Sequence, residues 1–277
     1  MIQQTNTPHD AAAATSEKRE KSTLDRAIVL TGRKLRKLIA ILQSRQSLIG
    51  DTPVLDTAHF PEFKVLEDNW RDVLGEVREI LKFREQVPKF HEVSTYQTKI
   101  SKDDDWRTFF LYGFGTKLKR NCAQAPKTAA MLETIPNLQT AWFSILAPGA
   151  HIPPHKGVTK GIVTCHLGLI VPKDREKCRL RVEDEYCTWQ EGWIFVFDDT
   201  YRHEVRNDTD DERVVLLWHV DRPMKTPARL LHKLFIAGLK KSSFFKSPQK
   251  NMETFEDRFE QATRDAAETL EKMSTRD

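Results

Sequence analysis

The feature that most constrains this chain is a change in the spacing of its apolar residues near position 139. Before it, apolar residues recur every three or four positions, which predicts helices over 62–84 and 125–135. After it, five short runs rich in β-branched and aromatic residues are separated by clusters of Gly, Pro and Asp. These runs cover 141–146, 161–171, 179–183, 193–198 and 213–220. Short, closely spaced strands predict a mainly β core, a compact barrel or jelly roll, with flanking helices.

Basic amphipathic helices are expected at both ends. Residues 24–50 and 229–241 place Leu and Ile at helical spacing, with Arg and Lys between them. Such a helix either docks on its own domain or binds a membrane surface or a partner, and the sequence leaves both open. The expected order is a disordered tail (1–23), a basic helix (24–50), a β-rich domain (51–224) and a helical extension (225–277).

Composition excludes several classes of protein. The chain has 277 residues, and 44 Lys and Arg against 40 Asp and Glu leave a net charge of +4. This mild excess argues against nucleic-acid binding over the whole surface. No stretch of about 20 residues lacks charge, and no secretory signal is visible, so no membrane span is expected. We expect a cytoplasmic protein with free thiols, in peripheral contact with the inner face of a membrane if the basic helices bind there.

Two histidines are candidate metal ligands. His155 follows two prolines before the run at 161–171, and His203 follows the run that ends near Asp198. Histidines from neighbouring positions of a small barrel can converge on iron, zinc or copper. On spacing alone, two surface or hydrogen-bonded histidines are the commoner interpretation. His151 and His155 are four apart, but the prolines between them exclude a helical zinc pair.

Longer motifs surround these histidines. They are PGAHIPPHKG at 148–157, CHLGLIVP at 165–172, WQEG at 189–192, FDDTYRHEV at 197–205, and Arg213 at the start of the last run. In this order and spacing, over roughly 60–223, the chain resembles the aspartyl/asparaginyl β-hydroxylase family. That family includes animal aspartyl hydroxylases and bacterial lipid A hydroxylases. The resemblance implies a double-stranded β-helix that binds non-haem Fe(II) and uses 2-oxoglutarate and O2.

The resemblance also implies roles for five residues. His155 and His203 match the iron-binding histidines. Arg213 matches the arginine that binds the distal carboxylate of 2-oxoglutarate, Ser144 matches the serine that shares this carboxylate, and His166 matches a histidine at the other end of the cosubstrate. A planar guanidinium can bind a carboxylate through two parallel hydrogen bonds. Without the resemblance, Arg213 would be read as a surface arginine paired with acidic neighbours, and Ser144 as an ordinary strand serine.

Two positions depart from the family pattern. Gly157 stands where most non-haem iron oxygenases have a carboxylate ligand. The animal aspartyl hydroxylases also have a small residue there, which leaves the position to water, or to chloride in a halogenase. Thr164 replaces the arginine that usually precedes the HLGL motif by two residues. This change predicts weaker 2-oxoglutarate binding, a different substrate, or loss of activity.

The sequence thus predicts an Fe(II)- and 2-oxoglutarate-dependent dioxygenase that hydroxylates an unactivated C–H bond. An Asp/Asn-type or other amino-acid substrate, free or in a peptide, is slightly favoured. The alternatives are an acyl chain of a lipid A-type molecule at a membrane surface, and a non-catalytic binding module. A zinc enzyme that uses His166 or His219 as further ligands lacks a supporting motif. The oligomeric state is not predicted.

Overall fold

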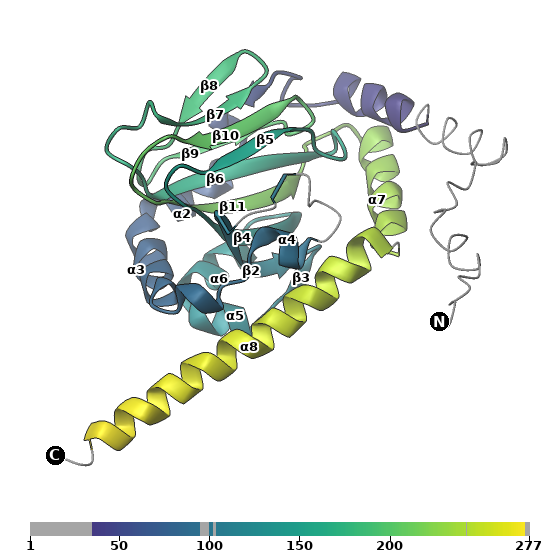
Figure 1. Cartoon of the computed structure of the whole chain (residues 1–277). Coiled ribbons are helices and arrows are strands. Elements are labelled where there is room, and N and C mark those ends of the chain that lie inside the picture. Colours follow the sequence, from purple (N-terminus) through teal and green to yellow (C-terminus); the bar gives the residue numbers. More distant parts are fainter. Residues whose placement is uncertain (1–34, 95–99, 102–103, 242, 275–277) are drawn as a thin grey trace, which may run out of the picture. The chain divides into compact units, whose positions relative to one another are not determined.

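The computed structural model describes residues 35–94, 100–101, 104–241 and 243–274 (Figure 1). The chain divides into two units, 1–38 and 39–277, and only 35–38 of the first are described. The sheets, the pocket and helices α2 to α8 all belong to the second unit. The predicted tail (1–23) and the first part of the predicted basic helix (24–34) lie outside the described residues. No helix in the described ranges is long and apolar enough to cross a membrane.

Two antiparallel sheets form the core, as predicted for a jelly roll. The larger contains, in spatial order, β1 (Val54–Leu55), β9 (Ile194–Phe197), β6 (Ile162–Ile170), β11 (Arg213–Asp221), β4 (Leu138–Leu146), β2 (Trp106–Gly113) and β3 (Thr116–Lys117). The smaller contains β5 (His151–His155), β10 (His203–Asn207), β7 (Cys178–Val182) and β8 (Glu185–Thr188). Strands that are far apart in the sequence pair directly, as β4 does with β11.

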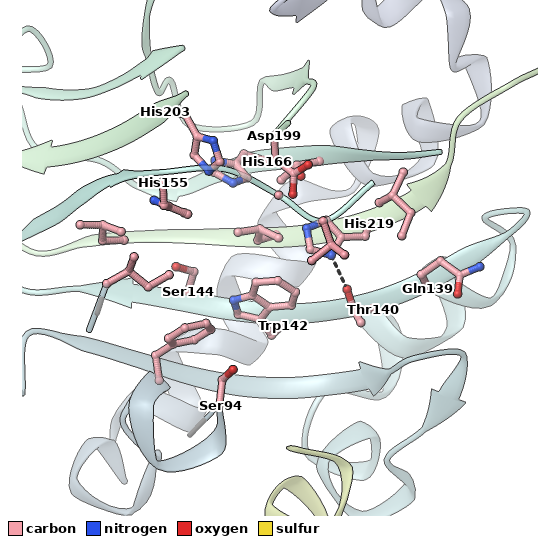
Figure 2. A pocket seen from close by; sticks show the side chains of 18 of the residues that line it. Ser94, Gln139, Thr140, Trp142, Ser144, His155, His166, Asp199, His203 and His219 are labelled. Carbon is pink, nitrogen blue, oxygen red and sulfur yellow. Dashed lines mark hydrogen bonds between the residues drawn. The ribbon is translucent and has the colours of Figure 1, made fainter. Parts of the chain in front are cut away.

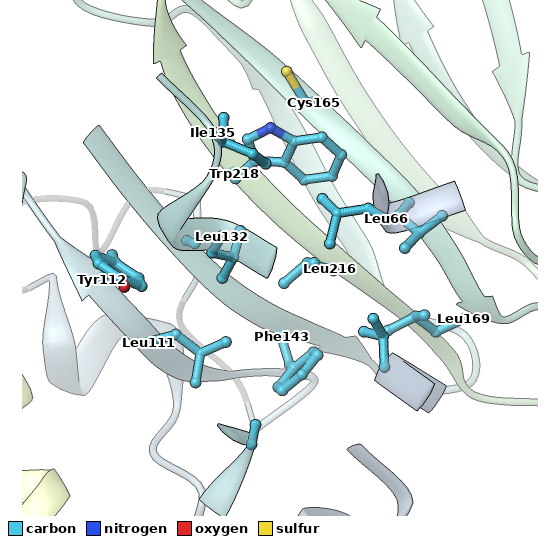
Figure 3. Close-up of a cluster of buried hydrophobic side chains, with 14 of the residues drawn as sticks. Leu66, Leu111, Tyr112, Leu132, Ile135, Phe143, Cys165, Leu169, Leu216 and Trp218 are labelled. Carbon is cyan, nitrogen blue, oxygen red and sulfur yellow. The ribbon is translucent and has the colours of Figure 1, made fainter. Parts of the chain in front are cut away.

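Helices cover the outer face of the larger sheet, and helices also form the C-terminal part of the chain. They are α2 (Lys64–Asp68), α3 (Trp70–Leu81), α4 (Phe90–Val93), α5 (Lys119–Gln124), α6 (Pro126–Glu133), α7 (Thr226–Lys240) and α8 (Ser243–Ser274), with 3₁₀ turns η1 (Thr57–His59), η2 (Pro61–Phe63) and η3 (Arg84–Gln86). Side chains of α2 and α6 meet those of β2, β4, β6 and β11 in one apolar cluster (Figure 3).

Alternation along β11 separates this outer cluster from the interior between the sheets. Successive strand residues point to opposite faces of a sheet. Leu216 and Trp218 therefore join the cluster under the helices, whereas Val215 and Leu217 join a second cluster between the two sheets. The same strand thus builds the core with one face and presents Arg213, Leu217 and His219 on the other.

The C-terminal helices pack on the β core. The carboxylate of Glu256 on α8 accepts hydrogen bonds from the backbone amides of Arg120 and Asn121, at the start of α5. Free amides at a helix start favour a negative group. Phe259 is buried in the cluster under the helices. The predicted helical extension at 225–277 therefore belongs to the same compact unit as the β core.

Two predicted helices differ from those observed. The basic helix ends at residue 45, not at 50, because the chain then turns back and Ser47 pairs with Met224. The predicted helix over 62–84 is interrupted at Asn69, whose side-chain amide donates to the carbonyl oxygen of Val65. Asn side chains compete for helical backbone groups in this way.

Six strands were missed, and two of them contain the candidate metal ligands. His155 is the last residue of β5 and His203 the first of β10, so neither lies in a loop. The prolines at 153 and 154 hid β5, since proline removes a backbone donor. They are tolerated because β5 is an edge strand of its sheet. The other four missed strands are β2, β8 and the two-residue strands β1 and β3.

Candidate active site

A pocket of about 240 Å³ lies between the two sheets (Figure 2). β4, β6 and β11 form one wall, β5 and β10 the other, and α4, α7 and α8 add side chains at its rim. All five residues singled out from the sequence, Ser144, His155, His166, His203 and Arg213, line this pocket. The fold therefore brings together side chains that are up to 69 residues apart.

His155 and His203 face each other across the β5–β10 pair. They are direct partners in the strand register, and their ring centroids are 4.1 Å apart. Each ring uses Nδ1 to donate to a backbone carbonyl oxygen, that of Pro153 at 2.8 Å and that of Tyr201 at 3.0 Å. A carbonyl oxygen only accepts, so both Nδ1 atoms carry the proton and both Nε2 atoms have a free lone pair. This arrangement is typical of histidines that bind metals.

Burial keeps both imidazoles neutral. Desolvation lowers the pKa of His155, and desolvation together with the neighbouring His155 lowers that of His203 to about 4. A neutral imidazole is the form that ligates a metal. Within the described residues, no group of three His, Cys, Asp or Glu side chains is placed to hold an ion. Among the described residues, the site therefore offers the two histidines of this pair as protein ligands.

Asp199 fills the space where a side chain at position 157 would lie. A Cβ built on Gly157 would overlap the carboxylate of Asp199, far inside the 3.0 Å that real Cβ atoms respect. Asp199 lines the pocket, and its Oδ1 is shielded from solvent without a hydrogen-bond partner. Burial and the adjacent Asp198 raise its pKa to about 7. The sequence analysis missed this residue; its position four residues before His203 was the available signal.

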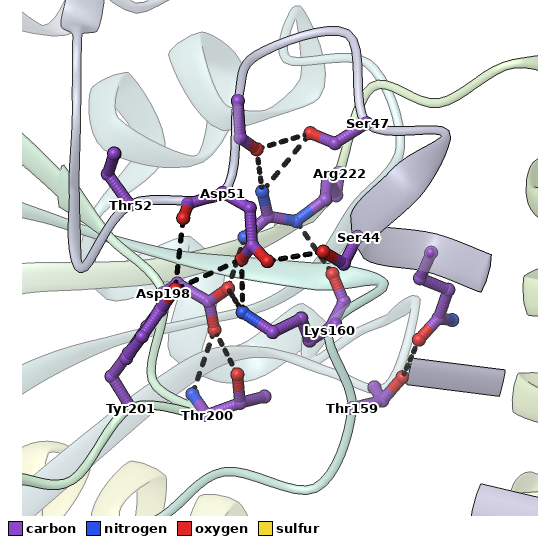
Figure 4. A network of polar contacts seen from close by, with 12 residues as sticks. Ser44, Ser47, Asp51, Thr52, Thr159, Lys160, Asp198, Thr200, Tyr201 and Arg222 are labelled. Carbon is purple, nitrogen blue, oxygen red and sulfur yellow. Dashed lines mark hydrogen bonds and ion pairs between the residues drawn. The ribbon is translucent and has the colours of Figure 1, made fainter. Parts of the chain in front are cut away.

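A network of charged groups fixes the loop between β9 and β10 that contains Asp199 (Figure 4). Arg222 and Asp198 form an ion pair in which both side chains are fully buried. Lys160 bonds to both Asp198 and Asp51, and the backbone amide of Thr200 donates to Asp198 at 2.9 Å. Because each buried charge has a partner, the network satisfies the requirement for burying ions. It holds the chain rigidly on both sides of Asp199.

The opposite end of the pocket is built to receive an anion. Arg213 is 1 % exposed, and its Nη1 lies 3.5 Å from Ser144 Oγ. Ser144 Oγ also accepts a hydrogen bond from Trp106 Nε1 at 3.0 Å, which leaves its own proton to donate. Burial lowers the pKa of Arg213 to about 10, so it stays charged at neutral pH, and its Nε has no partner among the described residues. A buried cation without a carboxylate is costly.

His166 adds a donor between this anion end and the histidine pair. Its Nδ1 accepts from Trp189 Nε1 at 3.2 Å, so Nε2 carries the proton. Nε2 is buried and has no hydrogen-bond partner among the described residues. Thr164, two residues earlier on β6, faces the same pocket, and so does His219 on β11. His219 follows Arg213 by an even number of residues, and this spacing was the sequence signal for its place in the pocket.

Comparison with known sequences identifies the class of protein. A family profile described as aspartyl/asparaginyl β-hydroxylase matches residues 67–223, more than half of the chain. The chain therefore belongs to this family of hydroxylases.

Relatives in the family differ in what their names describe. The chain is 42 % identical over 191 residues to the ornithine lipid ester-linked acyl 2-hydroxylase of Rhizobium tropici, covering 69 % of this chain and 68 % of that protein. It is 31 % identical over 177 residues to human aspartyl/asparaginyl β-hydroxylase, covering 62 % of this chain but only 22 % of that protein. It is 29 % identical to aspartate β-hydroxylase domain-containing protein 2 of Xenopus tropicalis, covering 68 % and 54 %.

Proposed function

We propose that this protein is an Fe(II)- and 2-oxoglutarate-dependent hydroxylase whose substrate is the acyl chain of a lipid. The observation that supports it most is that two neutral histidines and a buried arginine, which has no carboxylate partner among the described residues, lie in one pocket. Zinc or copper also suits two imidazoles. A cosubstrate that carries a carboxylate would also balance the charge of Arg213, whose described contacts include the hydroxyl of Ser144 and the ring of Trp189.

His155 and His203 would hold the iron through their Nε2 atoms, since both Nδ1 atoms donate to carbonyl oxygens. Gly157 supplies no ligand, and Asp199 borders the space beside it. We propose that water completes the coordination there and hydrogen-bonds to Asp199. With 2-oxoglutarate and O2 bound, the iron would supply the oxidant that removes hydrogen from a C–H bond. The protein positions the reactants and excludes bulk water.

Arg213 and Ser144 would bind the distal carboxylate of 2-oxoglutarate. The guanidinium provides charge and parallel donors, and the free hydroxyl proton of Ser144 provides another donor. His166 Nε2 would donate to the cosubstrate closer to the metal, and Trp189 holds its ring in that orientation. Thr164 is not part of this anion end, so the absence of arginine there leaves the carboxylate site intact. This favours a changed substrate over a lost activity.

The lining of the pocket favours an acyl chain over the amino-acid substrate that the sequence slightly favoured. Its wall is mostly apolar, with Phe90, Val93, Phe110, Trp142, Leu217, Ile236, Leu239 and Met252 among the lining residues. Besides Arg213 and Asp199, the described residues that line the pocket include one further charged residue, Lys156. It is exposed and lies beside Glu183. An amino acid would need buried partners for its own charges. The 42 % identical relative, named for an ester-linked acyl chain, points the same way.

α7 offers a route from a membrane to this pocket. Its inner face contributes Ile236 and Leu239 to the lining, while Leu230 and Leu234 on its outer face are 59 % and 64 % exposed. Arg229 and Lys233 lie on that outer face as well. Each basic residue near an anionic leaflet contributes about 1 kcal/mol, so exposed leucines among basic residues suit an anionic lipid surface.

An anaerobic titration tests the proposed chemistry. Adding Fe(II) and then 2-oxoglutarate to the metal-free protein should give a saturable visible charge-transfer band, absent in His155→Ala. In air, the loaded protein with an ester-linked ornithine lipid should form succinate and a hydroxylated acyl chain, detected by mass spectrometry. A folded protein that gives no band and no succinate would favour the non-catalytic binding module.

A further inference from the structure

Three polar side chains stand in a row on the floor of the pocket. His219 on β11 pairs directly with Thr164 on β6 and with Thr140 on β4, and all three line the pocket. Directly paired residues on one face of a sheet have Cβ atoms about 5 Å apart. The row is therefore a compact group on three adjacent strands, surrounded by apolar lining.

Two donors in this row have no fixed partner for their protons. Thr164 is 3 % exposed, and its Oγ1 has no hydrogen-bond partner among the described residues. His219 Nδ1 lies 2.7 Å from Thr140 Oγ1. When that hydroxyl donates, Nε2 of His219 carries the proton, and in Figure 2 this nitrogen points away from Thr140, on the side of His155 and His203. A buried hydroxyl without a partner is costly unless a ligand satisfies it.

The row is electrically neutral. Burial lowers the pKa of His219 to about 4, so the ring is uncharged at neutral pH, and neither threonine carries charge. Neutral donors suit the carbonyl oxygen of an ester or amide. A carboxylate buried here would lack the compensating charge that Arg213 provides at the other end.

The position of the row makes it available to the substrate instead of the cosubstrate. Arg213 and His219 are six residues apart on β11, about 20 Å at 3.3 Å per residue. His166 pairs with Leu217, between these two ends. A cosubstrate held by Arg213 and His166 therefore lies on the side of His166 that is away from the polar row.

We infer that Thr164 and His219, oriented by Thr140, bind the ester carbonyl of the acyl lipid, an inference that rests on the proposed function. Holding this carbonyl would place the first carbons of the acyl chain beside the histidine pair, while the rest of the chain extends along the apolar wall. Thr164 and His219 are then specificity residues, and hydroxylation occurs close to the carbonyl instead of farther along the chain.

The test compares two lipids that differ only in the carbonyl. An ester-linked lysolipid and its ether-linked analogue are titrated separately into metal-free protein, and binding is followed by fluorescence of the pocket tryptophans 106 and 142. The wild type should bind the ester about five- to tenfold more tightly, the value of one or two neutral hydrogen bonds. Thr164→Val, nearly identical in shape, should lose the part of this preference that the Thr164 hydroxyl provides and keep only the part from His219, and Thr164→Ser should restore the full preference.

Thr108→Val is the matched control. Thr108 is also fully buried with an unpartnered Oγ1, but it lines a separate small cavity. Its substitution should leave the preference for ester over ether unchanged. Equal binding of both lipids by the wild type, or an unchanged preference in Thr164→Val, would overturn the inference while leaving the iron chemistry intact. Binding of neither lipid would refute the acyl substrate itself, and the anaerobic titration would still test the metal site separately.

Discussion

Gly157→Ala is expected to disrupt the site through Asp199. The added methyl would overlap the carboxylate of Asp199, and that side chain is short and enclosed, so it cannot swing away cheaply. Overpacking of this kind costs about 1–3 kcal/mol. For a domain of this size, each kcal/mol lowers Tm by roughly 2–4 °C, so a fall of about 2–12 °C is expected. Displacement of Asp199 beside the histidine pair should also weaken Fe(II) binding.

A double variant separates this clash from a general effect of removing glycine. Asp199→Ala removes the overlapping carboxylate, so adding Gly157→Ala to it should cost almost nothing further, which gives a coupling energy of about 1–3 kcal/mol. Gly75→Ala is the control, because nothing lies near its Cβ position and alanine favours its helix. Thermal unfolding by circular dichroism gives the four stabilities. Wild-type stability and iron affinity in Gly157→Ala would refute the placement of Asp199.

Three other predictions concern the anion end, the metal ligands and α7. Arg213→Lys should weaken 2-oxoglutarate binding about 10- to 100-fold in the anaerobic titration while the iron still binds, since lysine cannot donate two parallel hydrogen bonds; an unchanged affinity would exclude Arg213 from the cosubstrate site. The pKa values of His155 and His203 are lowered, so both histidines should stay neutral as the pH falls. The affinity for Mn(II), measured by electron paramagnetic resonance, should therefore fall less than tenfold from pH 7.5 to 5.5. Two ordinary imidazoles of pKa about 6.5 would instead lose about 100-fold in affinity. Replacing Leu230 and Leu234 by Ser should reduce co-sedimentation with anionic vesicles at least tenfold, because each fully buried leucine contributes about 1.5–3 kcal/mol. The charge-transfer band should not change. Equal co-sedimentation would remove α7 as the membrane-binding element.

Local patterns predicted the parts of this molecule whose structure is locally determined. Runs rich in β-branched and aromatic residues located β4, β6, β7, β9 and β11. Of these, β7 alternates between buried and half-buried residues, whereas β4, β6 and β11 are buried on both faces. β5 was missed because its two prolines are acceptable only at a sheet edge, and the edge is a property of the assembled sheet. The five site residues came from motifs and the resemblance, not from periodicity. Asp199 was missed since only the folded loop shows that its carboxylate fills the space beside Gly157.

The division of each strand between two faces explains how this fold can change its substrate without losing its core. On β6, Val163 and Cys165 are fully buried in the cluster under the helices, whereas Thr164 between them faces the pocket. An exchange of arginine for threonine at this position therefore removes a charge from the pocket without creating a cavity in that cluster. On β11, His219 likewise faces the pocket, while Trp218 and Val220 on either side of it belong to the cluster under the helices. Substitutions at 164 and 219 should alter lipid preference much more than the free energy of unfolding.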